Sequence, residues 1–189
     1  MPEGPGVRPT ADRVREALFA IVGPRVVAAR VLDAYAGSGA LGFEALSRGA
    51  AEVLFIESDR RVARLLRDNG LSLGLEGRFS VKNARAADWL EHGSPEAPFD
   101  LVFADPPYEK AEIDSFLPLA ASPRWLSATG WIVVERGRSR PAIEVAGTGV
   151  SRFRTAFYGK SGLDFYRAGA VPGAKTGGGG GSPPGPPRK

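Results

Sequence analysis

Short apolar runs alternate with stretches of helical periodicity, and this alternation limits the possible fold more than any other feature of the sequence. The strand-like runs fall at positions 31–36, 53–57, 79–81, 101–104 and 131–135. The helix-like stretches fall at 14–21, 40–48, 86–91 and 113–120, with one more after Asp59, a residue type that caps helices. Strands that alternate with helices form βαβ units, so we predict an α/β, Rossmann-like fold with a mostly parallel, doubly wound sheet.

The C-terminal part departs from this alternation. Two strand-like runs, at 153–158 and 163–166, are separated by a Gly- and Ser-containing turn, which predicts an antiparallel hairpin that closes the sheet. Beyond the hairpin, 12 of the 18 residues at 172–189 are Gly or Pro, so this segment cannot bury enough apolar surface to offset its ordering entropy. We therefore predict a leader at 1–7, one domain at 8–171 and a disordered basic tail at 172–189.

Positive charge is concentrated in the predicted tail. The chain has 25 Lys and Arg against 21 Asp and Glu, a net charge of +4, and Lys175, Arg188 and Lys189 supply +3 of it. The remaining body has 22 basic and 21 acidic residues, so its net charge is only +1. Binding to nucleic acid would therefore need a local basic patch, because the domain as a whole is nearly neutral.

Several classes of protein and site are excluded by composition. The absence of Cys excludes disulfides, thiolate zinc sites and cysteine nucleophiles, and a single His, His92, cannot form a multi-histidine metal site. We therefore predict no metal. The sequence has neither an apolar run long enough to span a bilayer nor the shape of a signal peptide, and its pattern does not demand a dimer. We expect a cytoplasmic monomer without a membrane partner.

A glycine loop follows the first predicted strand and identifies a nucleotide site. Gly37-x-Gly39-x-x-Gly42 matches the dinucleotide fingerprint, and Glu57 ends the second strand 20 residues after Gly37, where an acid can bond ribose hydroxyls. NAD enzymes and S-adenosylmethionine (AdoMet) methyltransferases both place a nucleoside at such a loop, and a ligand-free tight turn is the structural alternative. Asp33 favours AdoMet, because a carboxylate before the loop repels a pyrophosphate but suits a cationic amino-acid end.

A second motif, Asp105-Pro106-Pro107-Tyr108, ends the fourth predicted strand. An exocyclic amine on a nucleobase is a poor nucleophile, because its lone pair is delocalised into the ring. The Asp105 carboxylate and the Pro106 carbonyl can accept the amine hydrogens, in a loop stiffened by two prolines. Tyr108 offers a flat face on which the base can stack. A proline turn that merely ends the strand is the structural alternative.

Together these motifs resemble those of class I amino-methyltransferases, which are marked by Asp/Asn-Pro-Pro-Tyr/Phe after an AdoMet loop. More narrowly, the chain resembles the RsmD-type family of bacterial enzymes, which methylate N2 of a guanine in 16S ribosomal RNA. The narrower likeness rests on RPTADRVREALF at 8–19 and VLDAYAGSGALGFEALSRGA at 31–50, and it extends from about Arg8 to Arg167.

The resemblance implies a class I AdoMet-dependent methyltransferase fold, with AdoMet as cofactor and specific residues in each role. The implied cofactor-binding residues are Asp33, Ala36, Gly37, Ser38, Gly39, Glu57 and Ala86. The implied catalytic residues are Asp105, Pro106, Pro107 and Tyr108. The implied RNA-binding residues of the N-terminal motif are Arg8, Thr10 and Arg13.

The chain departs from the family pattern at two places. Only seven residues precede Arg8, where members usually carry a strand rich in Gly and Arg, and this predicts weaker RNA binding. Arg85 stands where relatives often have an acidic or amide residue, which predicts a weaker contact to the adenine amine.

Charged residues after the fifth strand leave a structural and a functional interpretation open. Arg136, Arg138 and Arg140 can form part of a basic rim for RNA phosphates, or simply be solvated loop charges. Lys160, in the hairpin turn, is the residue of this kind that we assign to RNA binding. Glu135 ends the strand near the predicted cleft, where both a structural role and contact with a loop or substrate remain open.

We predict methyl transfer from AdoMet to the N2 amine of a guanine in 16S ribosomal RNA. An adenine-N6 methyltransferase acting on DNA or RNA is the main alternative, since guanine and adenine both carry an exocyclic amine. A non-catalytic AdoMet- or nucleotide-binding module comes next, and an NAD oxidoreductase third. The small basic patch favours an assembling small ribosomal subunit over naked RNA as the substrate.

Overall fold

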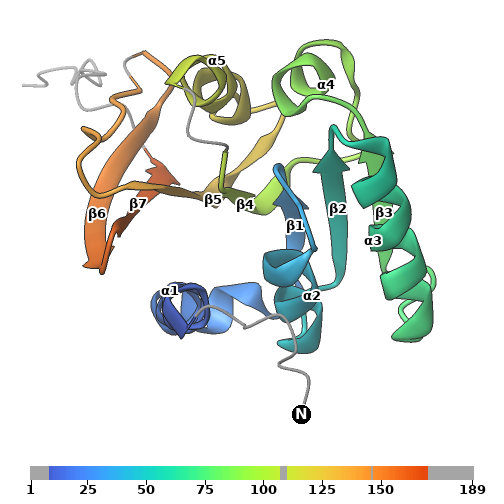
Figure 1. Ribbon diagram of the computed structural model, residues 1–189. Coiled ribbons are helices and arrows are strands. Elements are labelled where there is room, and N and C mark those ends of the chain that lie inside the picture. The colour runs from blue at the N-terminus through green and yellow to red at the C-terminus, as the bar shows by residue number, and fades with distance from the viewer. Residues whose placement is uncertain (1–8, 107–109, 146, 170–189) are drawn as a thin grey trace, which may run out of the picture.

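The computed structural model describes residues 9–106, 110–145 and 147–169. Seven strands form one sheet in the order β3-β2-β1-β4-β5-β7-β6 (Figure 1). The strands are β1 (Arg30–Asp33), β2 (Glu52–Glu57), β3 (Phe79–Asn83), β4 (Phe99–Ala104), β5 (Leu126–Gly137), β6 (Val150–Tyr158) and β7 (Ser161–Ala168). Strands β1 to β5 pair in parallel, and β7 runs antiparallel to both β5 and β6. The prediction of a mostly parallel α/β sheet with a C-terminal hairpin is therefore confirmed.

Helices cover the two faces of the sheet unequally. They are α1 (Pro9–Val22), the 3-10 helix η1 (Gly23–Val26), α2 (Ala40–Ser47), α3 (Arg60–Ser72), α4 (Ala86–His92) and α5 (Lys110–Ala120). Apolar side chains of α1, α2 and α3 pack on one face, and those of α4 and α5 on the other. Figure 1 shows α4 and α5 together above the sheet. Among the described residues, no helix combines the length and apolar composition needed to cross a bilayer.

Most predicted elements are present, and the differences are at their ends. β1 stops at Asp33, because the residues up to Ala36 already turn toward the glycine loop. β5 is longer than predicted, because Leu126 already pairs with Phe99 of β4, with a register irregularity before the next pair, Leu101 and Trp131. Asp59 caps α3 as predicted, and its side chain accepts hydrogen bonds from the backbone nitrogens of Arg61 and Val62.

The strand order reverses between β1 and β4, and this reversal fixes the place of a ligand site. β1 pairs with β2 on one side and with β4 on the other. The helix that follows β1 and the helix that follows β4 pack on opposite faces of the sheet. In open α/β sheets, ligands bind beyond the carboxyl ends of the strands at such a switch point. Asp33 ends β1 and Asp105 follows β4, so both predicted acids lie at this crevice.

Two glycines of the loop after β1 are required by close packing. Gly39 precedes α2 with a φ of 82°, and a Cβ there would lie 2.5 Å from side-chain atoms of Leu66 and Phe43. Gly42, inside α2, faces β2, and a Cβ there would lie 2.1 Å from the ring of Phe55. The third glycine of the motif therefore serves the approach of helix to strand rather than ligand contact.

We expect Gly42→Ala to destabilise the protein by about 1–3 kcal/mol, because the added methyl group overpacks the buried Phe55 ring. Thermal or urea unfolding monitored by circular dichroism measures the change. Gly169→Ala is the matched control, since a Cβ at Gly169 meets no atom within 4 Å. Equal stability of the two variants would contradict the packing role of Gly42.

Candidate active site

A cavity of about 380 Å³ opens at the switch point, beyond the carboxyl ends of β1, β2, β3 and β4. Four residues predicted to bind cofactor or substrate line it: Gly37, Glu57, Ala86 and Asp105. They lie at or just after the carboxyl ends of four different strands, so only the folded sheet brings them together.

Glu57 joins the glycine loop to the start of α3. Its Oε2 accepts a hydrogen bond of 2.9 Å from the backbone nitrogen of Gly37, and its Oε1 accepts one of 2.7 Å from that of Asp59. A carboxylate that is held at both oxygens by backbone groups cannot rotate freely. The side chain is therefore preorganised at the cavity wall, in a position suited to accept from ribose hydroxyls.

Asp33 is buried, with 2% of its surface exposed, and it contacts the start of α2, just after the glycine loop. Its Oδ2 accepts a 2.9 Å hydrogen bond from the backbone nitrogen of Gly42. Burial raises the pKa of the Asp33 carboxyl to about 7, and the negative charges of Asp105 and Glu57 act in the same direction, while the Gly42 bond opposes them. Asp33 does not line the cavity, but its charge lies close enough to couple with Asp105 and Glu57, which do.

Asp105 stands on the cavity wall directly after β4, and the following Pro106 is buried. Desolvation by the surrounding protein raises the pKa of Asp105 to about 7, and the negative charge of Glu135 adds to the effect. Because Asp105 is exposed, solvent screens part of its repulsion by Glu135. Pro107 and Tyr108 lie outside the described residues.

Two polar residues of the cavity lining, Tyr35 and Glu112, were not predicted as part of the site. Tyr35 follows β1 and its hydroxyl is buried without a hydrogen-bond partner among the described residues. Glu112, in the first turn of α5, pairs with Arg85 across the cavity at 3.1 Å. The orphaned hydroxyl and the Glu112 carboxylate offer polar contacts to a bound ligand, and Glu112 is an acceptor near the place where Arg85 departs from the family pattern.

The other predicted residues lie apart from the cavity lining. Ala36 is buried and donates from its backbone nitrogen to the carbonyl of Ile56, and Ser38 is exposed on the glycine loop. Arg13 is exposed on α1, and Lys160 is exposed in the turn between β6 and β7. Arg8 and the side chain of Thr10 lie outside the described residues.

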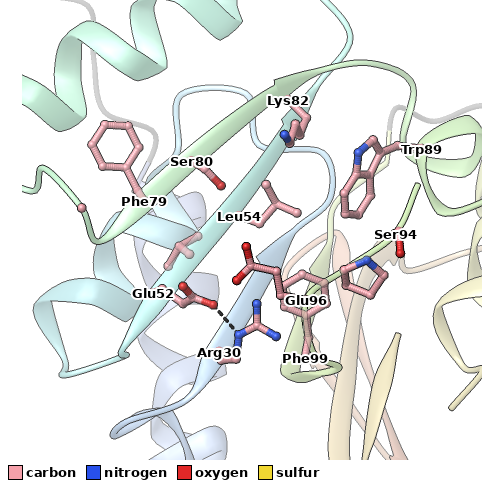
Figure 2. Close-up of a pocket in the computed structure, with 13 residues that line it drawn as sticks. Arg30, Glu52, Leu54, Phe79, Ser80, Lys82, Trp89, Ser94, Glu96 and Phe99 are labelled. Atoms are coloured by element: carbon pink, nitrogen blue, oxygen red, sulfur yellow. Dashed lines mark hydrogen bonds and ion pairs between the residues drawn. The ribbon is translucent and has the colours of Figure 1, made fainter. Parts of the chain in front are cut away.

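A second cavity, of about 270 Å³, lies at the opposite end of the sheet. It lies where the short α4 leaves β2 and β3 uncovered, near the ion pair between Arg30 and Glu52 (Figure 2). Both residues begin their strands, so this cavity is at the amino edge. It contains none of the predicted site residues, and its mixed charges do not select a ligand.

Comparisons with known proteins agree with this geometry. A sequence model of the family described as Conserved hypothetical protein 95 matches residues 1–167. The chain is 43% identical to the Ribosomal RNA small subunit methyltransferase D of Escherichia coli (strain K12) over 136 residues, which cover 71% of this chain and 67% of that protein. The solved structure of the Escherichia coli protein yhhF matches with a TM-score of 0.78 and 36% identity, covering 90% of this chain and 92% of that one.

A more distant structure shows the fold alone. The magnesium protoporphyrin IX methyltransferase of Synechocystis PCC 6803, solved with bound SAM, matches with a TM-score of 0.65 at 14% identity, over 88% of this chain and 87% of that one. The architecture is therefore that of class I AdoMet-dependent methyltransferases.

The raised pKa of Asp33 predicts a pH-dependent cost in stability. The carboxyl titrates near 3.8 when unfolded and near 7 when folded. The free-energy cost of burying its charge is therefore absent below pH 4, grows between pH 4 and 7, and is complete above 7. We therefore expect the stability of Asp33→Asn relative to wild type to increase by about 1–3 kcal/mol between pH 5 and 8. Urea unfolding at a series of pH values measures it.

Asp68→Asn, an exposed change on α3, is the control for this measurement. Parallel pH profiles for wild type and Asp33→Asn would refute the interpretation of Asp33 as a buried charge.

Proposed function

The chain belongs to the Conserved hypothetical protein 95 family, and on this premise we propose that it transfers a methyl group from AdoMet to the N2 amine of a guanine in small-subunit ribosomal RNA. The observation that carries the proposal is the position of Asp105. An acceptor for amine hydrogens stands on the wall of the cavity that also contains the glycine loop and Glu57.

The charges of the cavity support a cationic cofactor. Asp33, Glu57 and Asp105 couple electrostatically around it, and burial of this negative charge is unfavourable until a cation compensates it. A sulfonium compound with an ammonium group meets that need, whereas a pyrophosphate would add repulsion. Gly37 and Glu57 would hold the ribose side, and Ala86 and its neighbours the adenine side.

The reaction needs an activated amine more than a strong base. AdoMet, when bound, supplies a methyl group on a sulfonium, which is a good electrophile. The Asp105 carboxylate and the Pro106 carbonyl accept the two amine hydrogens, and they hold the nitrogen with its lone pair directed out of the ring plane. As the amine gains its methyl group it becomes positively charged, and its proton passes to Asp105 or to solvent.

Ribosomal RNA is the proposed partner, and an assembling small subunit the proposed form of it. Basic and acidic residues of the body nearly balance, 22 against 21, and Arg13 and Lys160 are among the exposed cations of the described chain. A particle that presents an already shaped RNA surface needs fewer phosphate contacts than a flexible strand does. We propose that Arg8 and Thr10 also contribute to RNA binding, and that the protein acts as a monomer in the cytoplasm.

The direct test uses tritiated AdoMet and small-subunit particles from cells that lack their own copy of this enzyme. We expect label in N2-methylguanosine at a single position of the 16S RNA, identified by nuclease digestion and chromatography of nucleosides. Label in N6-methyladenosine would replace the proposal with its adenine alternative. Binding of AdoMet by calorimetry without any label would identify a non-catalytic module.

Asp105→Ala should lower kcat about 100- to 1,000-fold, because the amine loses a charged acceptor in the transition state. AdoMet affinity, measured by calorimetry, should stay within about threefold, a change of less than 1 kcal/mol. Asp68→Ala on α3 controls for loss of an aspartate elsewhere. Unchanged turnover in the Asp105 variant would remove the role assigned to this residue.

A further inference from the structure

A narrow cleft opens beside the cavity, at the carboxyl end of β5. It is lined by Asp105 and Pro106, by Glu135 and Arg136, and by Arg140 and Ser161. Asp105 lines both the cavity and this cleft. A base whose amine reaches Asp105 from the cavity side can therefore place the rest of its hydrogen-bonding edge in the cleft.

Glu135 is the neighbour of Asp105 across the sheet. The register of β4 and β5 pairs Ala104 with Val134, so the next residues, Asp105 just after β4 and Glu135 within β5, lie at the same level. Adjacent strands lie about 4.8 Å apart, and side chains at the same level of a parallel pair lie on the same side of the sheet. The negative charge of Glu135 also acts on the Asp105 carboxyl, so the two groups are close.

The Glu135 carboxylate is unpaired among the described residues. Within the described part of the chain, the structure gives its side chain neither a hydrogen bond nor an ion pair. The adjacent Arg136 does not neutralise it, because that guanidinium is paired with the fully buried Asp164 through contacts of 2.5 and 3.3 Å. Thr155 donates a further 2.5 Å hydrogen bond to Asp164, which holds this ion pair in place.

An unpaired carboxylate next to Asp105 distinguishes the two amino-bearing purines. Guanine presents its N2 amine and its N1–H as two adjacent donors, so it matches two adjacent carboxylates. Adenine presents its N6 amine beside an unprotonated N1, and that acceptor would face the second carboxylate unfavourably. Enzymes that act on a flipped base commonly recognise it through this edge.

We propose that Glu135 is the residue that selects guanine, accepting the N1–H of the target base while Asp105 accepts from its N2 amine. This inference rests on the proposed function, and it assigns the choice of base to a residue outside the Asp-Pro-Pro-Tyr loop. Arg140 completes the match, because it lines the same cleft and its Nη2 is buried without a partner among the described residues. The guanine O6, the next group along the edge, is an acceptor for a guanidinium.

Base analogues at the methylated position test the assignment. Small-subunit particles are reconstituted with guanine or 2-aminopurine at the nucleotide that the tritium assay identifies. 2-Aminopurine keeps the 2-amine but has an unprotonated N1 and no O6. Wild-type enzyme should prefer guanine by about 100-fold or more in kcat/KM, since the analogue loses a donor and gains repulsion.

Glu135→Gln should lower kcat/KM for guanine about 10- to 100-fold and should shrink the preference over 2-aminopurine at least about tenfold. Glu144→Gln is the matched control, because Glu144 is an exposed residue after β5 that pairs with Arg152 at 2.7 Å. Calorimetric AdoMet affinity and the thermal midpoint are measured for both variants. A loss of stability or affinity with an unchanged base preference would show that Glu135 is structural and would overturn the inference.

Failure of the inference and failure of the proposed function give different results. If wild-type enzyme methylates guanine but Glu135→Gln keeps the wild-type preference, the assignment of Glu135 falls while the proposed function stands. If wild-type enzyme labels no nucleoside, or labels adenine, the proposed function falls and the assignment falls with it.

Discussion

The burial of the Asp33 carboxylate is the constraint on which the rest of the site depends. The side chain is covered because β1 lies between β2 and β4, and because Gly42 lets α2 approach closely enough for its backbone nitrogen to reach Asp33. The same central position couples Asp33 to Glu57 and Asp105. Clustered negative charge weakens the folded protein on its own, and it becomes favourable only with a cation nearby. These charges therefore lower the stability of the folded protein without a ligand, and they would raise its affinity for a cationic one.

Periodicity and local motifs were sufficient to predict the order of elements and the edge of the sheet at which several motif residues gather. Each predicted strand and helix of the body is present, since apolar spacing determines which face of an element is buried. The Gly37 loop, Glu57 and Asp105 meet in one cavity because parallel strands bring their carboxyl ends to the same edge. The ends of β1 and β5 were less predictable, because pairing and turning, rather than composition, decide where a strand stops.

Contacts between distant segments could not be predicted from the sequence. Glu112 pairs with Arg85 across 27 positions, and Arg136 pairs with Asp164 across 28. No local motif marks either pair. In the sequence, an arginine that pairs with a buried acid cannot be distinguished from an arginine exposed on a loop. Asp164 is fully buried because β7 inserts between β5 and β6, an order that hairpin chemistry alone does not specify.

Asp105 lies between two acids that have different tasks in the proposed reaction. Asp33 couples to it on the cofactor side, and Glu135 couples to it on the side of the base cleft. Desolvation and the negative charge of Glu135 raise the pKa of Asp105, and a protonated carboxyl would donate a hydrogen where the amine needs an acceptor. A positive charge placed in the cavity lowers the pKa of Asp33 and Asp105 together. In the proposed reaction the charge of the cofactor would thus favour the form of Asp105 that accepts the amine hydrogens, and binding of the methyl donor would prepare the site for the base.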